Sequence, residues 1–165
     1  MKILFLDVDG VLNSERWFIA RSPLKSLPDA NPIDSMWPQG HIELVKVMML
    51  NDIVKRTDCH IVLSSSWRQM MAFTDFGNLL AGKFNFNFPD RFIGATPILG
   101  TTQVRGFEIQ TWLDTEWKQN NTVIEKFVIL DDDNDMAELV SHLVQTTWEN
   151  GMEESHRDEV IRRLL

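Results

Sequence analysis

The sequence has one cysteine, no tyrosine and no apolar run approaching the ~20 residues that a membrane-spanning helix requires. The single Cys59 excludes an internal disulfide and fits a reducing compartment. Only four apolar residues separate Lys2 from Asp7, which is too short a run for a signal peptide. We therefore expect a cytoplasmic protein that makes no contact with a membrane.

Basic residues are also scarce. The chain has 16 Lys and Arg against 24 Asp and Glu, which gives a formal net charge of −8. A protein that holds nucleic acid mainly through its phosphates usually has a basic surface, so this charge argues against such binding without forbidding a local basic groove. The length of 165 residues and the hydrophobic content of 44% fit one domain, residues 1–165, with a sizeable core.

Short apolar runs alternate with segments of helical periodicity, which predicts an α/β fold with a central parallel sheet of about five strands flanked by helices. Residues 13–39 hold four of the six prolines and predict an irregular loop, and the alternating residues 84–88 suit an edge strand or a packed loop. The predicted strands are residues 2–7, 60–63, 92–95, 126–130 and 143–147. The predicted helices are residues 40–55, 67–80, 108–117, 136–142 and 155–165.

Polar clusters follow three of the predicted strands directly. In parallel sheets, ligands bind beyond the carboxyl ends of the strands, at the point where the strand order reverses. We therefore expect the three clusters to converge on one crevice. They are Asp7-Val-Asp9-Gly10, Ser64-Ser65 and Asp131–Asp135.

The aspartates after the first strand admit two interpretations. Asp9-Gly10 is a strong turn signal, so the pair can simply form an Asx-type turn. Alternatively, a carboxylate at the strand tip can attack phosphorus, while one two residues on can serve as acid and base. A hard cation and a phosphoryl group would also offset the cost of carboxylates beside an apolar sheet.

The run Asp131-Asp-Asp-Asn-Asp135 is a costly cluster of like charge unless a cation joins it. An EF-hand loop does not fit, because Met136 stands at the turn glycine and His142 at the bidentate glutamate. A solvated acidic turn remains the simple alternative.

With these motifs, the chain resembles the haloacid dehalogenase-like (HAD) phosphohydrolase superfamily, whose first motif is an apolar strand followed by Asp-x-Asp-Gly. The resemblance implies a three-layer Rossmann-like fold, with Asp7 as nucleophile and Asp9 as the acid that protonates the leaving group. An aspartate at the second position is a feature of the phosphatases and phosphomutases of that superfamily. The segments 13–39 and 69–104 are too short for a large cap domain, and a small flap formed by either segment is the alternative.

The resemblance also implies a phosphate-binding Ser or Thr after the second strand. Ser64 and Ser65 both fit, with a slight preference for Ser65, although a polar turn that caps the next helix is an alternative. Arg68 is placed to reach the same anion or the substrate beyond it. The family needs one further cation against the phosphate, for which Arg105 is best placed and Lys83 is the reserve.

The cofactor that the resemblance implies is Mg²⁺, which prefers oxygen ligands and retains waters. Asp131 would bind it directly, and either Asp132 or Asp135 would be the outer residue. The expected metal site is thus formed by Asp7, Asp9, Asp131 and Asp132.

Several stretches resemble one branch, the HAD domain of Swiss-Army-Knife-type RNA repair proteins. The implied function is a Mg²⁺-dependent phosphatase acting through an aspartyl-phosphate, on nucleic-acid ends or nucleotides. A catalytically weak binding module and a receiver-like phosphoacceptor domain are the alternatives, although a receiver would need an acidic residue in its mid-chain strand, which 92–95 lacks. The stretches are Ile61-Val-Leu-Ser-Ser-Ser-Trp-Arg68, Thr96-Pro97, Arg105-Gly-Phe-Glu-Ile109, Trp112-Leu113, Ile129-Leu-Asp-Asp-Asp133, Thr146 or Thr147, and Gly151-Met152.

Overall fold

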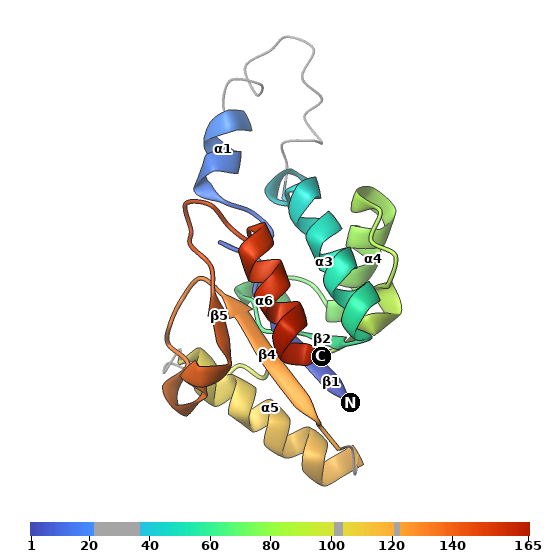
Figure 1. Ribbon diagram of the computed structural model, residues 1–165, viewed down its shortest axis with the longest axis vertical. Helices are drawn as coiled ribbons and strands as arrows, with labels where there is room; N and C mark the ends of the chain where they lie inside the picture. The colour runs from blue at the N-terminus through green and yellow to red at the C-terminus, as the bar shows by residue number, and fades with distance from the viewer. Residues whose placement is uncertain (22–36, 101–103, 121–122) are drawn as a thin grey trace.

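The structure is a computed structural model that describes residues 1–21, 37–100, 104–120 and 123–165 (Figure 1). Five parallel strands form one sheet in the order β3-β2-β1-β4-β5. The predicted α/β fold is therefore confirmed, and each predicted strand overlaps an observed one. The strands are β1 (Lys2–Leu6), β2 (His60–Leu63), β3 (Phe92–Ala95), β4 (Lys126–Asp131) and β5 (Leu143–Gln145).

Helices cover both faces of the sheet, which gives three layers (Figure 1). Successive side chains of a strand point to opposite faces, so Leu4 and Leu6 of β1 enter one core cluster while Ile3 and Phe5 enter the other. The first cluster is covered by α3 (Leu44–Thr57), α4 (Phe73–Phe84) and α6 (Glu154–Leu164), and the second by α5 (Arg105–Asn120) and the 3₁₀ helix η5 (Ala137–His142).

The strand register sets the polar residues at one level of the sheet. Leu6 of β1 pairs with Leu63 of β2 on one side and with Leu130 of β4 on the other. Asp7 N–H donates to the Leu130 carbonyl at 3.0 Å. The residues that come directly after the three leucines are Asp7, Ser64 and Asp131.

The order of the strands determines where the polar side chains meet. The chain runs from β1 outward through β2 to β3 and then returns to the other side of β1 to form β4 and β5. Helix α5 connects β3 to β4 across the face opposite to α3 and α4. The strand order thus reverses between β1 and β4, where open α/β sheets bind their ligands.

Helix α1 (Glu15–Arg21) contradicts the prediction that residues 13–39 form an irregular loop. The prolines that suggested a loop begin only at Pro23, and α1 ends before them. None of its residues is buried, so the helix lacks the apolar stripe by which surface helices are recognised in sequences. Residues 22–36 of the predicted loop lie outside the described residues.

Two predicted helices differ in kind from the observed ones. The segment 67–80 is the short 3₁₀ helix η3 (Ser66–Gln69) followed by α4, and η5 replaces the predicted helix 136–142. Residues 85–88 are loop rather than strand, because Asn85 ends α4 with a φ of 55°.

Among the described residues, no helix is both long and apolar enough to cross a lipid bilayer.

Candidate active site

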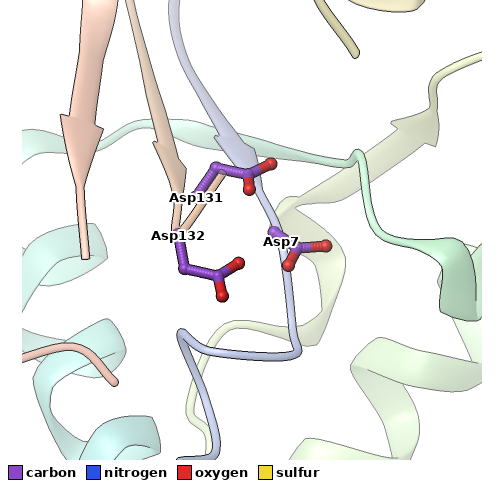
Figure 2. Close-up of side chains that lie close together, drawn as sticks. All are labelled: Asp7, Asp131 and Asp132. Carbon is purple, nitrogen blue, oxygen red and sulfur yellow. The ribbon is translucent and has the colours of Figure 1, made fainter. Parts of the chain in front are cut away.

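Three carboxylates meet at the carboxyl ends of β1 and β4. Asp7 follows β1, Asp131 ends β4, and Asp132 comes next, as Figure 2 shows. One oxygen from each lies within 4.8 Å of the others. The exposed fraction is only 5% for Asp7 and 1% for Asp131, whereas Asp132 is half-buried. The convergence predicted for the first and last of the three polar clusters is therefore observed.

Burial makes these carboxylates hard to ionise together. It raises the pKa of Asp7 to about 6, against the opposing effects of the Arg105 charge and a hydrogen bond from the Ser65 hydroxyl. Burial, and after it the charge of Asp7, raises the pKa of Asp131 to about 8. The pKa of Asp132 is raised as well, mainly by burial and then by the charge of Asp133. The site therefore favours an added positive charge.

Arg105 is the cation that lies between the two buried aspartates. Its Nη2 is 3.7 Å from Asp7 Oδ1 and its Nε is 3.5 Å from Asp131 Oδ2. Both distances exceed a good hydrogen bond, so the guanidinium stands beside the carboxylates without being bound to them in a fork. Arg105 thus has donors to spare, and its predicted binding of phosphate stays a prediction.

Asp135 fixes the start of α5 and with it Arg105. Its Oδ2 accepts the Arg105 backbone N–H at 2.9 Å, and its carbonyl accepts the Gly106 N–H at 3.1 Å. Of the two candidates for the outer metal residue, Asp132 belongs to the carboxylate cluster and Asp135 does not. Asp135 is instead placed to hold the helix that carries Arg105.

Arg68 does not face the crevice in the way the sequence suggested. Its guanidinium donates to the carbonyls of Ser64, Ser65 and Thr96 at 2.6 to 3.0 Å. It also forms a 2.6 Å ion pair with Glu108, and only 5% of its side chain is exposed. Arg68 therefore braces the loops after β2 and β3, and its donors are already used.

Both oxygens of the Asp9 carboxylate are held by neighbouring side chains. Trp67 Nε1 donates to Oδ2 at 3.0 Å, and Asn13 Nδ2 donates to Oδ1 at 2.8 Å. Asn13 also accepts the Gly10 N–H at 2.8 Å and donates to the His41 carbonyl at 3.0 Å. The carboxylate group of three formed by Asp7, Asp131 and Asp132 does not include Asp9, whose role as a metal ligand stays a prediction.

The two serines after β2 differ in their contacts. The Ser65 hydroxyl donates to the Asp7 carboxylate and accepts the Trp67 N–H at 3.3 Å. Ser64 Oγ is fully buried and has no hydrogen-bond partner among the described residues. Ser65 caps η3, which was one of the two roles considered for it, and it also lies beside Asp7. Its binding of phosphate stays a prediction.

The loop after β1 contacts Asp132, which follows β4, and Thr146, which follows β5. Gly10 has a φ of 69°, and a Cβ atom there would overlap the Asp132 carboxylate. The Thr146 hydroxyl donates to the Gly10 carbonyl at 2.6 Å, and the Thr146 N–H donates to the Asp131 carbonyl at 2.9 Å. Glycine is therefore required at position 10 both for its backbone conformation and for the approach of Asp132.

Asn13, Trp67 and Glu108 are the contributors to this site that sequence reasoning missed. No local sequence pattern identifies these three as site residues. Trp67 and Glu108 lie within motif stretches, and Asn13 lies three residues after Asp7-Val-Asp9-Gly10. Lys83, the reserve cation, is exposed in the last turn of α4, which leads to the start of β3 at the opposite edge of the sheet. Of these two candidates, Arg105 lies beside the carboxylates and Lys83 does not.

The donor set suits a hard divalent cation. Asp131 Oδ2 is buried and accepts no hydrogen bond from the described residues, and its Oδ1 accepts the Asp133 N–H at 3.0 Å. Carboxylate oxygens from Asp7, Asp131 and Asp132 would supply the charge that such an ion needs while leaving room for water.

The close approach of α5 to the acidic loop yields a prediction about stability. A Cβ atom on Gly106 would overlap the Met136 carbonyl, whereas one on Gly82 in α4 meets open space. We expect Gly106→Ala to lower the free energy of unfolding by about 1–3 kcal/mol, and Gly82→Ala to raise it by about 0.5–1 kcal/mol. Urea denaturation of both variants measures this, and equal effects would contradict the proposed close packing.

The raised pKa values predict how stability depends on pH in a chelating buffer. Between about pH 4 and 8 the folded protein retains protons that the unfolded chain has released, because the carboxyl pKa values rise from 3.8 to about 6 and 8 on folding. The free energy of unfolding should therefore fall as pH rises across this window, by up to ~1.4 kcal/mol per pH unit for each titrating proton. Asp131→Asn should flatten this slope and the exposed Asp133→Asn should not; a wild-type stability that rises with pH would contradict the assignment.

Residues 3–157 match the family described as the HAD domain in Swiss Army Knife RNA repair proteins. No curated protein and no solved structure matches the chain. Because the family match covers nearly the whole sequence, including every side chain of the site, the chain belongs to the family of HAD domains found in Swiss Army Knife RNA repair proteins.

Proposed function

We propose that this protein is a Mg²⁺-dependent phosphomonoesterase that works through an aspartyl-phosphate at Asp7. One observation carries the proposal: a buried carboxylate at the tip of β1 lies beside a second buried carboxylate, a guanidinium and a hydroxyl, at the reversal point of the sheet. These are the groups that phosphoryl transfer needs for attack and for charge stabilisation. The HAD domain family to which the chain belongs supports the same class of reaction.

In the first step Asp7 attacks phosphorus, a bond forms between its carboxylate oxygen and phosphorus, and the ester P–O bond breaks. The electron pair leaves with the ester oxygen, which takes a proton from Asp9. In the second step Asp9 accepts a proton from water, whose oxygen attacks phosphorus and releases inorganic phosphate and the Asp7 carboxylate. Trp67 and Asn13 hold Asp9 in one orientation throughout.

The remaining residues of the site offset the charge on the transferring group. Arg105 stands against Asp7 with unused donors, and the Ser65 hydroxyl and the unpartnered Ser64 hydroxyl lie at the same level of the sheet. Asp7, Asp131 and Asp132, whose oxygens lie within 4.8 Å of one another, would hold Mg²⁺, with Asp9 as a further predicted ligand. When bound, the ion supplies positive charge to the phosphoryl oxygens.

We propose nucleic-acid ends or nucleotides as the substrates. The matched family is named for RNA repair proteins, and the segment 69–104 folds largely into α4 and β3 rather than into a lid. Because the described residues of that segment form no lid domain, we expect the site to admit a phosphate at the end of a bulky chain.

The proposed nucleophile gives a direct test. Asp7→Asn removes the attacking oxygen and should lower Mg²⁺-dependent hydrolysis of an aryl phosphate by at least about 10³-fold. Asp133→Asn, an exposed neighbour of the same charge, should retain wild-type turnover. Full activity in Asp7→Asn would contradict the assignment; absence of turnover in the wild-type protein with every phosphate ester tried would favour a non-catalytic binding module.

The hydrogen bond from Asn13 to Asp9 gives a second test. Asn13→Ala leaves the acid held by Trp67 alone, so we expect kcat to fall by about 10- to 100-fold for an alkyl phosphate whose leaving group needs a proton. For p-nitrophenyl phosphate, whose leaving group departs as a stable anion, the loss should be several-fold smaller. An equal loss for both esters would show that Asn13 does not act through Asp9.

A further inference from the structure

Exposed large apolar side chains occur on the segments that follow β1, β2 and β3 at their carboxyl ends. Large apolar groups left in water can mark a surface that binds a ligand. The exposed fractions are 38% for Trp37, 59% for Met70, 56% for Ile98 and 52% for Phe107.

Trp37 is the member of this set that is connected to the catalytic groups. Its ring centroid is 5.3 Å from that of Trp67, with an angle of 51° between the planes. Trp67 is 2% exposed and donates its indole N–H to Asp9. A partly exposed aromatic ring therefore lies one side chain away from the proposed general acid.

The position of Asp9 decides which part of a substrate lies near Trp37. Asp9 must reach the ester oxygen, because it protonates the leaving group. In a nucleotide that oxygen belongs to the sugar, so the sugar and its base extend from phosphorus on the side of Asp9. The neighbours on that side include Trp67 and, packed on it, Trp37.

The charge of the protein argues that the base rather than the backbone is held. The formal net charge is −8, and the arginines at the site already lie beside carboxylates: Arg105 beside Asp7 and Asp131, and Arg68 beside Glu108. Gripping several backbone phosphates needs free cations, whereas stacking on an aromatic ring needs none.

We propose that Trp37 stacks on the nucleobase of the terminal nucleotide whose phosphate is removed. This inference rests on the proposed function and names the residue that selects its substrate class. Because every base has an aromatic face, such a contact accepts all four bases and depends little on salt.

The test measures binding and turnover separately. Fluorescence anisotropy would follow short single-stranded oligonucleotides with a phosphate on the 5′ or the 3′ end, carrying either a normal or an abasic terminal nucleotide. Binding would be measured with Mg²⁺ in the Asp7→Asn background, so that it does not depend on hydrolysis. Turnover of the same oligonucleotides and of acetyl phosphate, which has no base, would be measured in the otherwise wild-type protein.

We expect Trp37→Ala to weaken binding of the normal end by about 5- to 100-fold, to leave binding of the abasic end unchanged, and to spare acetyl phosphate turnover. Trp37→Phe should retain most of the preference for the normal end. Trp148→Ala, which removes a similarly exposed tryptophan that stacks on Phe18, should leave that preference unchanged.

Two results would overturn the inference. One is a wild-type protein that binds normal and abasic ends equally, and the other is a Trp37→Ala variant that weakens both ends alike. If the proposed function is wrong, the wild-type protein will turn over neither the oligonucleotides nor acetyl phosphate. A preference for the normal end that vanishes in Trp37→Ala would support the stacking contact whether or not turnover is seen.

Discussion

The structure depends on holding the Asp7 and Asp131 carboxylates side by side, out of water, at the end of an apolar sheet. Such a pair is costly because each charge loses its hydration and repels the other. Arg105 and the Ser65 hydroxyl offset part of that cost, and a cation with a phosphoryl group would offset the rest. Arg105 is held there by Asp135, which accepts hydrogen bonds from the start of α5, and by the close packing of Gly106.

The parts of the fold that follow from hydrophobic patterning were predictable. Buried parallel strands read as continuous apolar runs, so all five strands were found within one or two residues of their ends. Register then follows from pairing, and it brings Asp7 and Asp131 to one level. The convergence of the strand-end carboxylates was therefore predictable as well, whereas the catalytic role of each remains a proposal.

Contacts that depend on side-chain direction were not predictable. Arg68 turns back to its own loop because three carbonyls and Glu108 surround it there, and no local pattern reveals that choice. Trp67 and Asn13 reach Asp9 across 58 and 4 positions of sequence, and only the assembled loops bring them together. Helix α1 escaped prediction because it buries no apolar face.

In the proposed mechanism the phosphoryl group is transferred to the carboxylate of Asp7. The most direct measurement is a single turnover stopped by acid, followed by borohydride reduction and mass spectrometry of the peptides. An aspartyl-phosphate is reduced to homoserine, so we expect homoserine at position 7 and nowhere else in the chain. Rapid turnover with unmodified Asp7, or with homoserine at Asp9 or Asp131 instead, would contradict it.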